Sequence, residues 1–143
     1  ECNLSICEAS DYTVAVLPRL PAHYWRETRQ SNIEALSMAL EGLDDIRIWP
    51  STFGVILILP NTRTRDWLRQ RLRGKSIYSA VLWHPGEFDQ GAFNGYFGGR
   101  MLHIHADFRY DPADIERITH SIIAVWADRD SLNIIQAAPN LDV

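Results

Sequence analysis

The chain has 143 residues, of which 46% are hydrophobic and 22% are charged, and its formal net charge is −4. This length and composition are typical of one globular domain and exclude disordered, collagen-like and coiled-coil proteins. The longest apolar run, residues 55–60, is far shorter than the roughly 18 residues that cross a membrane, so we expect no membrane association. We therefore predict a single α/β domain over residues 1–143, with residues 1–10 forming a mobile N-terminus.

Two cysteines, Cys2 and Cys7, are present in the sequence. Two cysteines cannot form the disulfide framework of a small secreted protein, so we expect a reducing, cytoplasmic setting. Cys2 and Cys7 can be two free thiols or can form one small disulfide. A zinc site would need further ligands that the sequence does not place nearby.

The first third of the chain predicts a strand followed by a helix. Residues 13–17 are β-branched and apolar, which favours a strand, and prolines follow it. Ser31 and Glu34 have the spacing of a capping box, and apolar residues at helical spacing then predict an amphipathic helix over residues 32–43. We expect residues 22–30 to add one or two helical turns before it.

The middle of the chain predicts two strands and a second helix. Residues 46–49 form a short predicted strand, and residues 54–59 are an unbroken apolar run. Such a run is typical of a central strand that is covered on both faces. Asn61 or Thr62 can cap the next helix, which we expect to end at Arg73.

The last part of the chain predicts two further strands and a C-terminal helix. Residues 77–83 form one predicted strand, and residues 101–110 alternate between apolar and polar side chains, which indicates a half-buried strand. Asp111 followed by Pro112 is the strongest helix start in the sequence. Residues 132–137 fit either a last strand or a helical tail.

These elements define the predicted fold class. Up to residue 83 the order is β-α-β-β-α-β, a split βαβ pattern, and a strand and a C-terminal helix follow it. We therefore predict an α/β (α+β) layered sandwich, in which helices pack on a mainly antiparallel sheet.

Three polar residues alternate along the predicted strand of residues 101–110: His103, His105 and Asp107. Alternate strand residues share one face, so two imidazoles and a carboxylate can meet there, as in an open zinc or iron site. Three ligands in a line fit one ion poorly, and two of them with a residue from elsewhere fit it better; the candidates are His84, Glu87 and His120. The alternative is the solvated face of an antiparallel strand, with Asp107 and Arg109 pairing to neighbours.

The predicted helix that ends at Arg73 is rich in arginine. Residues 63–75 carry six basic side chains and one acidic side chain, although the whole chain is acidic. Guanidinium groups bind phosphate and carboxylate, so Arg65, Arg69 and Arg73 are candidate contacts to an acidic protein or to a nucleic-acid backbone. The alternative is a solvated helix face, because arginine favours helices and covers apolar surface with its stem.

Residues 84–99 form a long turn-rich segment that contains five glycines. Aromatic side chains on such a segment are typical binding anchors, and four are present: Phe88, Phe93, Tyr96 and Phe97. The alternative is a hairpin whose aromatic rings fold back onto the core. Because large apolar patches are rarely left exposed, we expect another chain to cover at least two of these rings, with a homodimer as the default.

The sequence contains neither a nucleophile elbow nor a phosphate-binding glycine loop. We therefore predict a non-catalytic binding protein without a cofactor: a small acidic bacterial inhibitor or regulator of the antitoxin or immunity type. Its expected partner is a basic toxin or enzyme, because acidic surfaces suit basic partners. A metal-dependent enzyme that uses the histidine strand is the first alternative, and nucleic-acid binding through the arginine-rich helix is the second.

Overall fold

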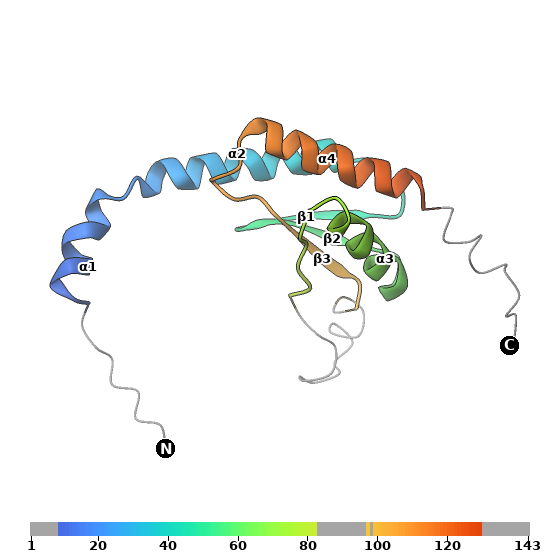
Figure 1. Cartoon of the computed structure of the whole chain (residues 1–143), viewed down its shortest axis with the longest axis horizontal. Coiled ribbons are helices and arrows are strands. Elements are labelled where there is room, and N and C mark those ends of the chain that lie inside the picture. Colours follow the sequence, from blue (N-terminus) through green and yellow to red (C-terminus); the bar gives the residue numbers. More distant parts are fainter. Residues whose placement is uncertain (1–8, 83–96, 98, 130–143) are drawn as a thin grey trace, which may run out of the picture.

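The computed structural model describes residues 9–82, 97 and 99–129. These residues form the layered α+β fold with an antiparallel sheet that the sequence predicts (Figure 1). The elements are α1 (Asp11–Val16), the 3-10 helix η1 (Leu17–Arg19), α2 (Ala22–Leu40), β1 (Arg47–Ser51), β2 (Gly54–Ile58), α3 (Thr62–Arg73), β3 (Met101–His105) and α4 (Pro112–Ala127).

The sheet has the order β1-β2-β3, and both neighbouring pairs are antiparallel. As predicted, β2 is the central strand and all five of its residues are buried. The predicted strand over residues 77–83 contributes, in its described part, one bridge between Ala80 and His103. Ser76 has a φ of 59°, and the amide of Ile77 still donates to the carbonyl of Leu72, so this segment remains tied to the end of α3.

The helices pack on one face of the sheet and bury the hydrophobic core between the two layers. In Figure 1, α2 and α4 run side by side above the strands, and α3 lies beside them. Trp126 is 2% exposed, and its indole nitrogen donates to the carbonyl of Asp44. The other side chains at the centre of the core come from every layer: Leu36, Leu40, Val55, Leu57, Leu68, Leu72, Leu102, Ile104 and Ile122.

Residues 13–17, which the sequence predicts as a strand, lie in helical structure instead. The Ser10 side chain caps α1 by accepting from the backbone amide of Thr13. No described strand lies next to this segment in a sheet, so the β-branched residues lack the cross-strand packing that gives them their β preference. The first strand of the predicted β-α-β-β-α-β order is therefore absent.

Helix α2 is one continuous helix of 19 residues and does not begin at the predicted capping box. Ser31 lies in its interior, and the Gln30 side chain donates to the carboxylate of Glu34. The first half of α2 continues beyond the sheet toward α1 (Figure 1), whereas Ile33, Leu36 and Leu40 in the second half are buried in the core.

Strand β3 ends at His105, five residues earlier than predicted. The carboxylate of Asp107 accepts from the backbone amide of Arg109 and closes a turn that ends the alternation. Helix α4 then starts as predicted, with Asp111 as N-cap and a capping box with Asp114. Residues 1–8 and the predicted element at 132–137 lie outside the described residues. Within the described ranges, no helix has the length and apolar character needed to cross a membrane.

Gly54 marks the closest approach between β2 and β3. A Cβ atom at this position would lie 2.1 Å from the carbonyl oxygen of Ile104. We predict that Gly54→Ala lowers the free energy of unfolding by about 2 kcal/mol or more, because the two strands must separate. Urea unfolding measures this change.

Gly74→Ala is the matched control. Gly74 has a φ of −61°, and its added Cβ would lie 3.3 Å from the nearest backbone oxygen. Its effect should stay below about 1 kcal/mol. Equal losses of stability in the two variants would contradict the close approach.

Candidate functional site

The outer face of the sheet is the face opposite the helices. Strand alternation and register place three rows of residues on this face. They are Arg47, Ile58 and Met101 in the first row, Trp49, Ile56 and His103 in the second, and Ser51, Gly54 and His105 in the third. Trp49 is 52% exposed and His105 is exposed, whereas His103 is 4% exposed. The outer face therefore combines an open aromatic ring with one buried and one accessible imidazole.

His103 lies against Ser51 across the side-chain-free space at Gly54. The Ser51 hydroxyl donates to the carbonyl oxygen of Gly54 at 2.9 Å, and its oxygen lies 3.5 Å from Nε2 of His103. Because the hydroxyl proton is already used, Ser51 can only accept from His103, so the geometry favours the tautomer with its proton on Nε2. Nδ1 of His103 is then a buried acceptor, and no described group donates to it.

The surroundings of His103 favour the neutral imidazole. Burial lowers the pKa of His103 below its usual value, and the charge of His105 lowers this pKa further. The two rings meet edge to face with their centroids 4.8 Å apart. In its neutral form His103 can accept a hydrogen bond but carries no charge.

The structure does not bring His103, His105 and Asp107 together as a set of metal ligands. The alternative ligands His84 and Glu87 lie outside the described residues, so a site that includes them stays a prediction. Strand β3 ends before Asp107, whose carboxylate binds the Arg109 side chain at 2.8 and 3.1 Å. That hydrogen bond holds the pKa of the Asp107 carboxyl below its usual value. In the part of the chain that the structure describes, no group of three or more His, Cys, Asp or Glu side chains is placed to hold a metal ion.

An aromatic-arginine cluster, made of Trp25, Arg29, Phe53 and Phe108, lies at the end of the sheet where β1 turns into β2. Trp25 and Phe108 stack with centroids 4.8 Å apart and an angle of 21° between their planes. The guanidinium carbon of Arg29 lies 5.3 Å from the Phe53 ring centroid and 5.9 Å from that of Phe108. The cluster thus joins α2, the β1–β2 turn and the segment after β3.

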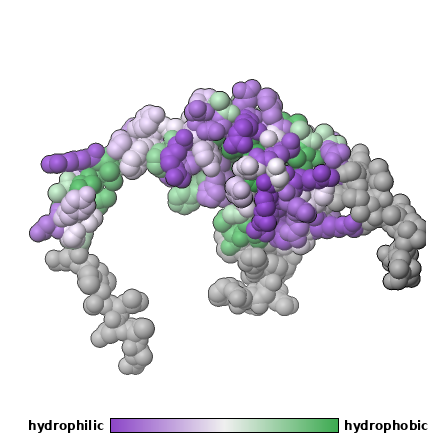
Figure 2. All heavy atoms as spheres, viewed as in Figure 1, coloured by the Kyte–Doolittle hydropathy of each residue, from purple (hydrophilic) through white to green (hydrophobic). Residues whose placement is uncertain are grey.

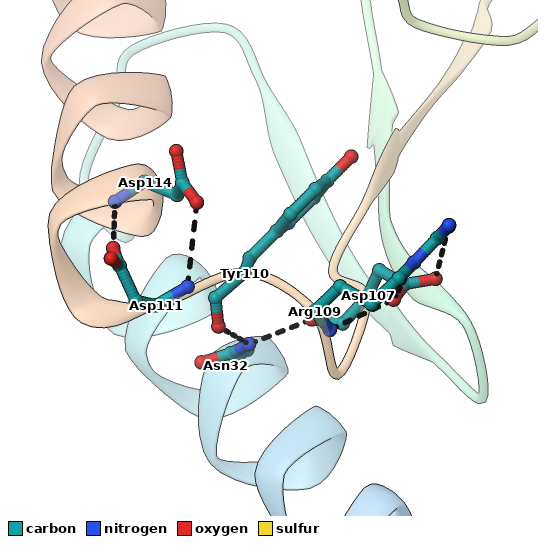
Figure 3. Close-up of polar contacts among 6 residues, drawn as sticks. All are labelled: Asn32, Asp107, Arg109, Tyr110, Asp111 and Asp114. Carbon is teal, nitrogen blue, oxygen red and sulfur yellow. Dashed lines mark hydrogen bonds and ion pairs between the residues drawn. The ribbon is translucent and has the colours of Figure 1, made fainter.

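Asn32 fixes the segment after β3 to α2 (Figure 3). Its side-chain amide donates to the carbonyl oxygens of Asp107 at 2.9 Å and Tyr110 at 3.0 Å. Asn32 is 7% exposed, so these two hydrogen bonds satisfy an amide that burial would otherwise penalise. The same contacts position Phe108 and Arg109 at the cluster.

The predicted arginine contacts occupy different surroundings. Arg65 is 8% exposed and pairs with Asp66 at 2.8 Å, so it is not open to a partner. Arg73 is exposed, and Arg69 is half-buried with no hydrogen-bond partner for its Nε among the described residues. For Arg69 and Arg73, binding stays a prediction.

The predicted aromatic loop falls largely on residues that are not described. Phe88, Phe93 and Tyr96 lie outside the described residues. Phe97 is half-buried, and its carbonyl accepts from the amide of Arg100. Its role in binding stays a prediction.

Sequence reasoning missed Asn32, Arg29 and Phe53. Asn32 lies four and eight residues before Leu36 and Leu40, so a polar residue on the apolar stripe of a helix was a readable signal. Arg29 and Phe53 meet through tertiary structure, and no local pattern joins them.

The fold is similar to parts of several solved aminotransferases. For TlmJ from Streptoalloteichus hindustanus the TM-score is 0.64 at 16% identity, covering 81% of this chain and 34% of that one. For the sugar aminotransferase Spr1654 from Streptococcus pneumoniae, in its PMP form, the TM-score is 0.65 at 13% identity, covering 85% of this chain and 35% of that one. For Helicobacter pylori PseC, an aminotransferase of pseudoaminic acid biosynthesis, the TM-score is 0.66 at 9% identity, covering 80% of this chain and 36% of that one.

The chain thus spans about a third of the length of these aminotransferases. Neither a protein-family model nor a curated protein matches the sequence.

This likeness corrects the functional predictions from the sequence. The neighbours are enzymes, which contradicts the expected non-catalytic inhibitor, antitoxin or immunity-type protein. One of them is described in its PMP form, which contradicts the expected absence of a cofactor. The sequence did not reveal this fold likeness, because the identities to the neighbours are only 9% to 16%.

The buried neutral state of His103 makes stability depend on pH. Its pKa is lower in the folded chain than the value of 6.5 for a free histidine, so the unfolded chain binds a proton more readily. Stability should be full above about pH 6.5 and fall as the pH decreases toward the folded pKa. The midpoint of urea unfolding, followed from about pH 7.5 to 5, measures this.

His103→Gln should remove this part of the pH dependence, whereas His105→Gln should keep most of it, because burial is the larger cause. If the urea midpoint of His103→Gln changed with pH as steeply as that of the unchanged protein, His103 would not be the source of the pH dependence.

Asn32→Ala removes both hydrogen bonds to the segment after β3. We predict a loss of roughly 1–3 kcal/mol in the free energy of unfolding, because the Asp107 and Tyr110 carbonyls lose their donor. Gln30→Ala, an exposed change on the same helix, should stay within about 0.5 kcal/mol. Thermal and urea unfolding of both variants check this, and an Asn32→Ala protein as stable as Gln30→Ala contradicts it.

Proposed function

We propose that this chain is one lobe of a pyridoxal-phosphate-dependent aminotransferase that acts on a sugar substrate. The observation that carries the proposal is the fold likeness, which extends over about four-fifths of this chain and about a third of each neighbour. The outer face and the aromatic-arginine cluster are the surfaces we assign to the substrate side, because the helices occupy the other face of the sheet.

This chain does not supply the lysine that would anchor the cofactor covalently. An aminotransferase holds its pyridoxal phosphate through a lysine, which a desolvated pocket or a neighbouring cation activates. The single lysine of the sequence, Lys75, is exposed and follows the end of α3, away from the outer face. In the proposed enzyme the anchoring lysine therefore comes from outside this chain.

The N-terminal arm, α1 and η1 with the start of α2, offers a surface for docking to the cofactor-bearing part. Its apolar side chains are exposed to an unusual degree: Tyr12 is 77% exposed, Val14 59%, Leu17 58% and Tyr24 63%. Figure 2 shows hydrophobic residues on this projecting arm. We assign the arm as the docking surface because these large apolar side chains are exposed together on one projecting segment.

Two further features belong to the proposal. We propose a cytoplasmic setting, which the small number of cysteines supports. A homodimer is compatible with docking through the arm, and stays a prediction.

The test measures the cofactor in the native assembly. The chain is isolated from its host under gentle conditions, and its content of pyridoxal phosphate and its amino transfer from glutamate to a nucleotide-linked keto sugar are measured. We expect about one cofactor for each copy of the chain in the assembly and none in the separately expressed 143 residues.

Lys75→Arg is the matched control, and it should leave the cofactor content unchanged. Loss of the cofactor in this variant, or a native protein with neither cofactor nor activity, would contradict the proposal.

A further inference from the structure

Arg29 is a cation on α2 whose side chain contacts two other segments of the chain. Its guanidinium lies over Phe53 from the β1–β2 turn and over Phe108 from the segment after β3. Phe108 is itself stacked on Trp25, one helical turn before Arg29. Asn32 holds the backbone on both sides of Phe108. The side chain of Arg29 is therefore preorganised.

No described carboxylate forms an ion pair or hydrogen bond with Arg29. Asp107 is close enough for Arg29 to contribute to lowering its pKa, but both of its oxygens already bind the Arg109 side chain. Within residues 9–82, 97 and 99–129, no acceptor lies within hydrogen-bond or ion-pair distance of Arg29. Its N–H donors are thus available.

We propose that Arg29 binds an anionic group of a small ligand, either a phosphate or a carboxylate. The contacts of Arg29 with Phe53 and Phe108 are cation–π contacts and involve no oxygen acceptor. The guanidinium can therefore still form two parallel hydrogen bonds to the oxygens of an anion. Phe53, which is 61% exposed, adds an apolar surface beside that anion. The inference rests on the proposed function in one respect, namely that the anion belongs to a substrate of the proposed enzyme.

A purely structural role makes a different prediction. If Arg29 only joined the two rings, its replacement would change stability and leave anion affinity unchanged. An anion-binding role requires the planar fork, so lysine at this position should keep the charge and still lose most of the affinity.

The experiment titrates the 143-residue chain with inorganic pyrophosphate and, separately, with glutamate, and follows binding by calorimetry and by NMR of the arginine Nε–Hε signals. We expect saturable binding of one of the two anions, with a shift of the Arg29 signal. Tighter binding of pyrophosphate would identify a phosphate-bearing ligand, and tighter binding of glutamate a carboxylate-bearing one.

Arg29→Met and Arg29→Lys should each weaken the preferred anion by at least about tenfold. Arg26→Met is the matched control, because Arg26 is exposed on the same helix and loses the same charge; its affinity should change less than about twofold. Thermal unfolding shows whether each variant is folded, and Arg29→Lys keeps the test valid if Arg29→Met is not.

Equal weakening in the Arg29 and Arg26 variants, or the absence of saturable binding of either anion, would overturn the inference. Because the titration needs no cofactor, either result would leave the aminotransferase proposal to its own test. Conversely, if the native assembly contained no cofactor, the aminotransferase proposal would fail while a measured anion site at Arg29 would stand.

Discussion

The burial of β2 along its whole length is the constraint on which the rest of the structure depends. A strand covered on both faces needs apolar side chains on both, and residues 54–58 supply them except at Gly54. There the neighbouring strand comes so close that no side chain fits. The space left by the missing side chain lets the His103 ring lie against Ser51, which is how a buried imidazole comes to lie on the outer face.

Asn32 links helix α2 to the segment that follows β3. A buried amide within a helix is costly unless both of its hydrogens are used, and here both go to backbone carbonyls of one turn. That turn carries Phe108, whose ring contacts Trp25 and Arg29 of the same helix. One side chain thereby fixes the relative position of the two halves of the aromatic-arginine cluster.

The sequence predicted the parts of the fold that depend on local signals. The cap at Asp111, the cap at Asn61 and the apolar run of β2 each carry their own chemistry, and all three lie where expected. Residues 13–17 were predicted wrongly because strand preference is realised only beside another strand. The histidine triad failed for a related reason: a turn at Asp107, made by contacts two residues apart, ended the alternation on which the pattern relied.

The continuity of α2 has a mechanical consequence. Its 19 residues contain neither glycine nor proline and extend over about 28 Å, so the helix has no weak point at which to bend. Its first half lies in the projecting arm, and its second half is embedded in the core. A displacement of the arm therefore moves the whole of α2 as a rigid helix and is transmitted to the core that packs on the sheet. Bending is therefore expected at the ends of the helix, at Pro21 before it or at the turn around Gly42 after it.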